Sequence, residues 1–89
     1  MAYRVTLAPA ARRALDHQLP EAVAAACYEF ILGALADDPY RVGKRLDSPM
    51  DGVYSARRGE FRVLYVIDQG AVRVLVVGIQ HRRDAYRPR

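Results

Sequence analysis

The clearest alternation of apolar and polar positions lies in the C-terminal half of the chain, in two runs rich in Val, Ile and Tyr. These runs, 61–67 and 72–79, are joined by the segment 68–71, with sequence DQGA. A short connection holding Asp and Gly between such runs is typical of a β-hairpin. Side chains alternate between faces along a strand, and here both faces are largely apolar. The pattern predicts two central strands, with helices on one face of the sheet and partial cover on the other.

The N-terminal half has the spacing of a strand followed by two helices. Apolar and polar residues alternate over 2–7, which predicts a strand. Apolar residues then recur at steps of three and four over 9–18 and over 23–35, so two helices should each present an apolar stripe. Pro20 separates them with a minimal connection, and Pro39 ends the second, because a residue before proline avoids the helical conformation.

A connection at 40–51 and a short strand at 52–57 complete the predicted order, β-α-α-β-β-β. This order predicts an α+β fold in which two N-terminal helices pack on one face of a small, mainly antiparallel sheet. The first strand can join parallel to a later one. The 89 residues contain no internal repeat or linker, so we expect residues 1–89 to form a single domain.

Composition excludes several classes of protein. Hydrophobic residues make up 52% and charged residues 27%, which are values of a globular chain and not of a disordered one. No apolar run is long enough to cross a bilayer, so we expect a cytoplasmic protein without a membrane partner. Cys27 is the only cysteine, and His17 and His81 lie far apart in the sequence. We therefore expect no disulfide, no metal site and no cofactor.

Charge is distributed unevenly along the chain. Residues 1–40 carry three basic and five acidic side chains, a net charge of −2, and residues 41–56 have a net charge of +1. Residues 57–89 carry eight arginines and three acids, a net charge of +5. Thirteen of the fourteen basic residues are arginine, which binds phosphate with two parallel hydrogen bonds. The C-terminal half therefore suits a polyanion or an acidic partner, and a solvated surface is the simpler alternative.

Five residues near the ends of the predicted strands are candidates for a catalytic site: Arg57, Arg62, His81, Arg82 and Tyr86. If the last three strands are adjacent, these residues converge on one face of the sheet. The set suits metal-free cleavage of RNA, in which a 2′-hydroxyl attacks its own 3′-phosphate and arginines stabilise the added negative charge. Tyr86 or His81 would move protons, because the pKa of arginine is too high. Alternatively, the cations bind an acidic partner and Tyr86 packs at a sheet edge.

Four further cations, Lys44, Arg45, Arg58 and Arg83, are candidates for binding RNA phosphates. Lys44 and Arg45 lie in the 40–51 connection, where ordinary loop charges are the alternative interpretation.

Four segments carry a resemblance to a known family. They are the opening strand with the helical hairpin, which contains the dipeptide Leu19-Pro20, the loop VGKRL, the segment GVYSARRGEFRVLYVID and the C-terminal HRRDAYR. Over nearly all of its length the chain resembles the RelE/ParE superfamily of bacterial toxins, and more closely the RelE branch. The resemblance implies a single RelE-like toxin domain with ribosome-dependent endoribonuclease activity. Such a toxin cuts mRNA in the decoding site, leaves a 2′,3′-cyclic phosphate and inhibits translation. The alternative is a ParE-like inhibitor of DNA gyrase that performs no chemistry of its own.

The resemblance also implies roles for individual residues. Arg57 matches a basic position at a strand end, Arg62 matches the arginine after the aromatic residue of the third strand, and Tyr86 matches the C-terminal tyrosine of the cleavage site. Ser55 stands where the best-studied members have a second basic residue. The arginine expected after the last strand has four candidate positions, namely Gln80, His81, Arg82 and Arg83. Arg82 is preferred, and His81 is a possible proton-transfer group.

The implied partners are the ribosome with its mRNA and an antitoxin encoded beside the toxin. We expect the antitoxin to bind through an acidic, amphipathic segment, and operator DNA to be reached only indirectly through it. The apolar surface expected to remain for this segment consists of Leu64, Val66, Leu75 and Val77.

Overall fold

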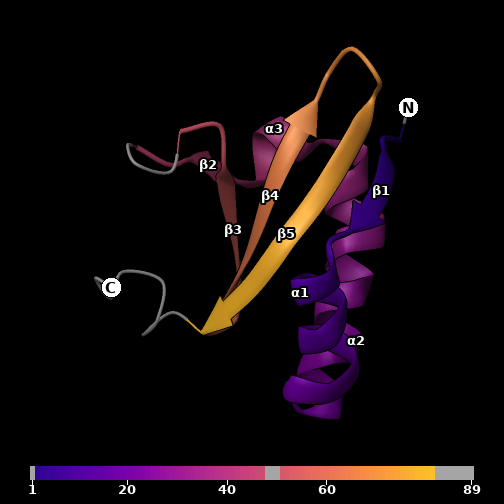
Figure 1. The fold of residues 1–89 in the computed structure, drawn as a ribbon, viewed down its shortest axis with the longest axis vertical. Helices are drawn as coiled ribbons and strands as arrows, with labels where there is room; N and C mark the ends of the chain where they lie inside the picture. Colours follow the sequence, from indigo (N-terminus) through magenta and orange to yellow (C-terminus); the bar gives the residue numbers. More distant parts are fainter. Residues whose placement is uncertain (1, 48–50, 82–89) are drawn as a thin grey trace.

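Five strands form one sheet in the computed structural model, which describes residues 2–47 and 51–81 (Figure 1). The strand order is β1-β5-β4-β3-β2. β1 pairs parallel to β5, and the other three pairings are antiparallel. The strands are β1 (Arg4–Leu7), β2 (Lys44–Arg45), β3 (Tyr54–Arg58), β4 (Phe61–Asp68) and β5 (Arg73–His81). The predicted α+β fold, with a mainly antiparallel sheet and a parallel first strand, is confirmed.

The two predicted helices are present, and each has a wider π-helical segment at its C-terminal end. α1 (Pro9–Arg13) continues into Ala14–Gln18, and α2 (Glu21–Phe30) continues into Ile31–Leu35. Pro9 occupies the first turn of α1, where its missing N–H leaves no bond unmade.

Two short elements lie in the segment predicted as a connection. They are α3 (Pro39–Val42) and β2, which has only two residues. The Asp38 carboxylate caps α3 by accepting a hydrogen bond from the Arg41 backbone N–H at 3.3 Å. Neither element is long enough to show a periodic pattern in the sequence.

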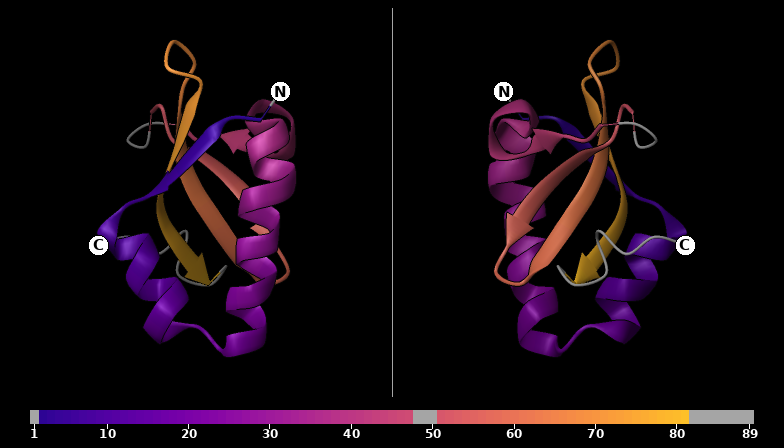
Figure 2. Two further views of the ribbon diagram at one scale, coloured as in Figure 1. Left: turned by 90° about the vertical axis from the view of Figure 1, so that its right-hand side faces the viewer. Right: turned by 90° about the vertical axis from the view of Figure 1, so that its left-hand side faces the viewer.

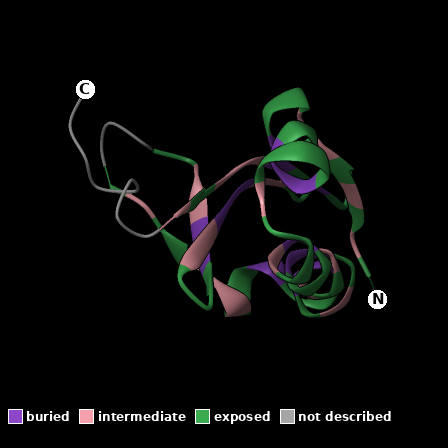
Figure 3. Ribbon diagram, turned by 90° about the horizontal axis from the view of Figure 1, so that it is seen from below, coloured by how far each residue is buried: buried purple, intermediate pink, exposed green. Residues whose placement is uncertain are grey.

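Both long helices cover the same face of the sheet, as predicted (Figure 2). The buried residues gather between the helices and this face (Figure 3). From the helices the core contains Ala11, Leu15, Ala24, Cys27, Ile31 and Leu35, and from the sheet Ala56, Val63, Tyr65, Val74 and Val76. Residues that pair across neighbouring strands have their side chains on the same face of the sheet. We call the face that carries the core residues, and that the helices cover, the helix side. The opposite face, on which the alternating residues lie, is the open side.

A β-bulge in β5 changes which side chains face the helices. Tyr65 pairs with Val76, whereas the preceding Leu64 pairs with Gly78, so Val77 is an extra residue on β5. Before the bulge the even-numbered residues of β5 face the helices, and after it the odd-numbered residues do. Gln80 therefore lies on the open side, and His81 lies on the helix side.

The open side exposes less apolar surface than expected. Leu64 is only 6% exposed, so the expectation that it contributes to a free surface is wrong. Val66 and Val77 are half-buried, and Leu75 is exposed. In residues 2–47 and 51–81, no helix has the length and apolar character needed to span a membrane.

Candidate active site

A basic pocket of about 430 Å³ opens on the side of the sheet away from the helices. It brings together four of the predicted site residues, Lys44, Arg45, Arg57 and Arg62. The remaining lining residues are Val42, Gly43, Leu46 and Ser55. Four cations around one concave surface form a site for an anion.

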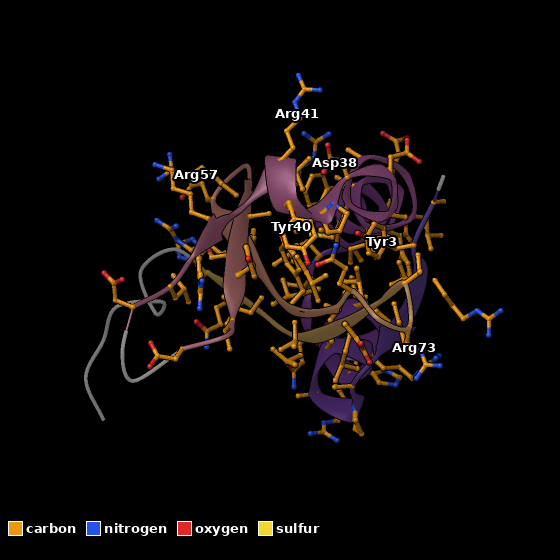
Figure 4. The ribbon with its side chains drawn as sticks, turned by 90° about the horizontal axis from the view of Figure 1, so that it is seen from above. Tyr3, Asp38, Tyr40, Arg41, Arg57 and Arg73 are labelled. Atoms are coloured by element: carbon orange, nitrogen blue, oxygen red, sulfur yellow. The ribbon has the colours of Figure 1, made fainter. Side chains whose placement is uncertain are left out.

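Two arginines that line this pocket face each other across neighbouring strands. Arg57 of β3 pairs with Arg62 of β4, and both lie on the open side. Arg57 is exposed and extends from the side of the sheet that carries β2, whereas Arg73 lies at the opposite side (Figure 4). Arg62 is half-buried. Like charges directly opposite each other destabilise a sheet, and an anion bound between them removes that repulsion. Two guanidinium groups placed in this way can stabilise negative charge on a bound anion.

The short strand β2 carries the other two cations. Lys44 pairs with Ser55, and Arg45 pairs with Tyr54. The preceding Gly43 lies so close to the Tyr65 hydroxyl that an added Cβ would collide with it. Glycine at position 43 thus allows β2 to approach the central strands and places Lys44 at the pocket.

Tyr65 fixes the backbone that precedes β2. Its ring is fully buried, and its hydroxyl donates a hydrogen bond of 2.6 Å to the Pro39 carbonyl oxygen. Burial, together with the neighbouring Tyr54 and Asp38, raises the pKa of Tyr65 to about 12. The hydroxyl therefore stays protonated at physiological pH and continues to donate this bond.

Ser55 lies in the basic pocket and is buried, with a relative exposure of 7%. Its hydroxyl makes no hydrogen bond within the part of the chain that the structure describes. The sequence drew attention to this position only as a place where a basic residue was expected.

Two of the candidates for the catalytic position after the last strand, Gln80 and His81, lie on opposite faces of the sheet at the end of β5. Gln80 pairs with Arg62 and is therefore on the open side, beside the two arginines. His81 pairs with Phe61 on the helix side. Its ring packs edge-on against Phe61 with centroids 5.1 Å apart, and its Nε2 lies 3.5 Å from a carboxylate oxygen of Glu60. The structure thus brings Gln80, and not His81, to the arginine pair.

Arg58 is also on the helix side, where its guanidinium lies 5.8 Å from the centroid of the Phe30 ring. Three further predicted site residues, Arg82, Arg83 and Tyr86, lie outside the described residues.

A second, mainly apolar pocket of about 670 Å³ lies on the helix side of the sheet. It is lined by the N-terminal half of α2 and the β3–β4 turn, and Arg58 and His81 both contribute to it. Cys27 also lines it, with a thiol whose pKa is raised by burial, an effect that the nearby Arg58 opposes. This cysteine belongs to the core, as predicted.

Within residues 2–47 and 51–81, no group of three or more His, Cys, Asp or Glu residues is placed to hold a metal ion.

The fold and the sequence together define the class of protein. The model of the ParE toxin family of type II toxin–antitoxin systems matches residues 5–86. The chain therefore belongs to the RelE/ParE superfamily of type II toxins.

Two toxins from Mycobacterium tuberculosis are similar to the chain over nearly its whole length. It is 46% identical to toxin RelE over 96% of this chain and 87% of that protein. It is 45% identical to toxin RelG over 98% of this chain and 99% of that protein. The structure also resembles a chain in the crystal structure of the toxin–antitoxin complex RelBE2 from the same organism. The TM-score is 0.87, with 42% identity over 91% of this chain and 99% of that one. The chain is therefore a toxin of a toxin–antitoxin pair, and a cognate antitoxin is its partner.

Proposed function

We propose that this toxin is a ribosome-dependent endoribonuclease that cleaves mRNA and so inhibits translation. The observation that carries the proposal is the basic pocket, in which Arg57 and Arg62 face each other beside Lys44 and Arg45. The similarity to toxins named RelE and RelG supports the RelE branch. Antitoxin binding would block the pocket, and operator DNA would be reached only through the antitoxin.

The proposed reaction uses the RNA's own 2′-hydroxyl as the nucleophile. The 2′-oxygen loses its proton and forms a bond to the adjacent phosphorus, the bond from phosphorus to the 5′-oxygen breaks, and the 5′-oxygen takes up a proton. The products are a 2′,3′-cyclic phosphate and a 5′-hydroxyl. Arg57 holds the scissile phosphate, and Arg62 with Arg82 stabilises the additional charge of the transition state. Lys44 and Arg45 bind neighbouring phosphates.

Proton transfer is assigned to Tyr86, because arginine keeps its proton and His81 lies on the other side of the sheet. Nearby guanidinium groups favour the phenolate form of a tyrosine. Arg58 and Arg83 are left as candidates for contacts with RNA outside the pocket.

Single-turnover cleavage on programmed ribosomes, with the 3′ ends mapped, tests the proposal. Arg62→Ala should slow cleavage about a hundred- to a thousandfold, the usual effect of removing one transition-state charge contact. Tyr86→Phe should also slow cleavage if Tyr86 transfers a proton. Arg73→Ala is the matched control, because Arg73 lies at the opposite side of the sheet (Figure 4). Cleavage at the parent rate by both Arg62→Ala and Tyr86→Phe would show that the assigned site is wrong.

A second candidate function is inhibition of DNA gyrase without catalysis. The family model that matches describes the ParE toxin of the parDE system, which favours this alternative. Incubation of the toxin with gyrase and relaxed DNA should leave supercoiling unchanged if the ribonuclease proposal is right. Inhibited supercoiling together with intact mRNA on ribosomes would select the gyrase function.

A further inference from the structure

A buried serine hydroxyl lies in the basic pocket and has no partner among residues 2–47 and 51–81. The residue is Ser55, near the middle of β3, with Lys44 opposite it on β2 and Leu64 opposite it on β4. Its side chain is on the open side of the sheet, as are those of Arg57 and Arg62. The side chain therefore lies between two flanking strands, in a residue that lines the same pocket as the four cations.

Burying such a hydroxyl without a partner destabilises the folded chain. Nearly all buried polar groups in proteins are hydrogen-bonded, so an exception calls for an explanation such as a bound ligand. Alanine would fill almost the same volume at this position without leaving a donor unsatisfied. The pocket also restricts the kind of ligand, because Lys44, Arg45, Arg57 and Arg62 all favour an anion.

We propose that Ser55 contacts the substrate directly, with its hydroxyl donating a hydrogen bond to a non-bridging oxygen of the phosphodiester held by Arg57 and Arg62. This inference rests on the proposed endoribonuclease function, and it adds a neutral donor to a site otherwise built from cations. A neutral donor supplies a directed bond without adding another positive charge to a site where arginines already repel each other.

Ser55→Ala tests the role, with Thr6→Ala as the matched control. Thr6 also carries a hydroxyl on a strand of the same sheet, but it lies on β1, at the edge opposite β2. Ser55→Ala should slow single-turnover cleavage on programmed ribosomes about ten- to a hundredfold, the loss expected for one hydrogen bond to a charged group. Thr6→Ala should cleave at the parent rate.

Thermal unfolding separates a substrate contact from a structural role. Ser55→Ala should leave the melting temperature unchanged or raise it, because the substitution removes a buried donor that nothing in the described chain satisfies. A lowered melting temperature accompanied by slower cleavage would assign Ser55 to the framework and overturn the inference.

A binding measurement makes failure of this inference distinguishable from failure of the proposed function. Inorganic phosphate titrated into the isolated toxin should shift the backbone amide NMR signals of Ser55, Arg57 and Arg62, and Ser55→Ala should weaken this binding severalfold. If the parent cleaves mRNA and Ser55→Ala cleaves equally fast, the inference is overturned and the endoribonuclease proposal stands. If the parent cleaves nothing but binds phosphate through Ser55, the endoribonuclease proposal fails and the anion contact stands.

Discussion

Val72 adopts an unusual backbone conformation in the turn between β4 and β5. Its φ is +53°, and among residues 2–47 and 51–81 no other residue except glycine has a positive φ. This region is costly for a β-branched side chain. The turn nevertheless makes two useful contacts. The Val72 N–H donates to the Gln69 carbonyl oxygen at 3.2 Å, and the Val72 carbonyl oxygen accepts from the Arg4 N–H at 2.9 Å, which fixes the start of β1.

Val72→Asn should stabilise the toxin. Asparagine tolerates the left-handed conformation, so the substitution should raise the free energy of unfolding by about 1 kcal/mol. Urea denaturation measures this change, with Ala71→Asn as the control in the same exposed turn. Cleavage should be unaffected, because the basic pocket involves none of these residues. An unchanged or lower free energy of unfolding for Val72→Asn would contradict the role given to backbone strain.

Tyr65 should make stability fall at alkaline pH. Its pKa is raised to about 12 in the folded state, whereas the unfolded chain titrates it near 10. Between these values the folded state binds more protons, so its stabilising effect is complete below about pH 10 and is lost progressively as the pH approaches about 12. The free energy of unfolding should fall in this window by about 1.4 kcal/mol per pH unit.

Tyr65→Phe isolates this effect. At pH 7 the variant should lose about 1–3 kcal/mol, since the buried Pro39 carbonyl loses its donor. Above about pH 10 its stability should depend less on pH than that of the parent. Tyr28→Phe, which removes a more exposed hydroxyl bonded to Asp16, is the control for the loss of a tyrosine hydroxyl. Equal slopes for Tyr65→Phe and the parent in denaturant titrations would rule out Tyr65 as the group responsible.

At the scale of elements, β2 depends on a single glycine. Gly43→Ala would place a Cβ against the Tyr65 hydroxyl and 3.0 Å from the Ser55 carbonyl oxygen. The variant should lose about 1–3 kcal/mol of stability through overpacking. The variant should also cleave mRNA more slowly, because displacement of β2 would move Lys44 and Arg45 away from the pocket.

Gly33→Ala is the control for this prediction. An added Cβ at Gly33 has no atom within 4 Å, and the residue is helical. Alanine at this position should therefore stabilise the toxin by up to about 1 kcal/mol without changing cleavage. Denaturation midpoints and single-turnover rates measure both variants. Equal stability of Gly43→Ala and the parent would show that β2 tolerates a wider spacing.

Most elements could be predicted because they are long enough to show a period. The two helices and the three long strands appear where the pattern places them, with ends shifted by about two residues. α3 and β2 could not be predicted, since four and two residues contain no repeat. They depend on tertiary contacts instead, namely those of Tyr65 with Pro39 and Gly43.

The sequence could predict which site residues lie at the ends of neighbouring strands. It could not predict which face of the sheet a residue occupies where the pairing register changes. Adjacent strands bring Arg57 and Arg62 together, as expected from their places in the sequence. His81 faces away because of the bulge at Val77, which alternation cannot reveal. The proposed role of Ser55 could be inferred only from the structure, which shows that the residue is buried and that its hydroxyl has no hydrogen-bond partner among residues 2–47 and 51–81.

At the scale of the whole molecule, the basic pocket and the charge distribution favour an acidic partner segment. Residues 57–89 carry a net charge of +5, and residues 1–40 carry −2. Arg57 projects from the open side of the sheet, where Leu75 offers exposed apolar surface. A partner segment with acidic and apolar faces would contact both.

The affinity of the toxin for its antitoxin should therefore decrease as salt is added. Screening weakens ion pairs at the surface, and Arg57→Ala should reduce the binding free energy by about 0.2–1 kcal/mol at low salt. Calorimetric titration over a series of NaCl concentrations measures both effects, with Arg12→Ala on the helical side as the control. A salt-insensitive complex would exclude charge neutralisation as the basis of inhibition.

The bulge at Val77 also determines how β5 tolerates changes in length. Because Val77 has no partner of its own on β4, its deletion leaves Leu64 opposite Gly78 and Arg62 opposite Gln80. A residue lost from a regular part of a strand instead turns every later side chain to the other face. Near position 77, β5 can therefore be shortened by one residue while the helix side and the open side each keep their own side chains.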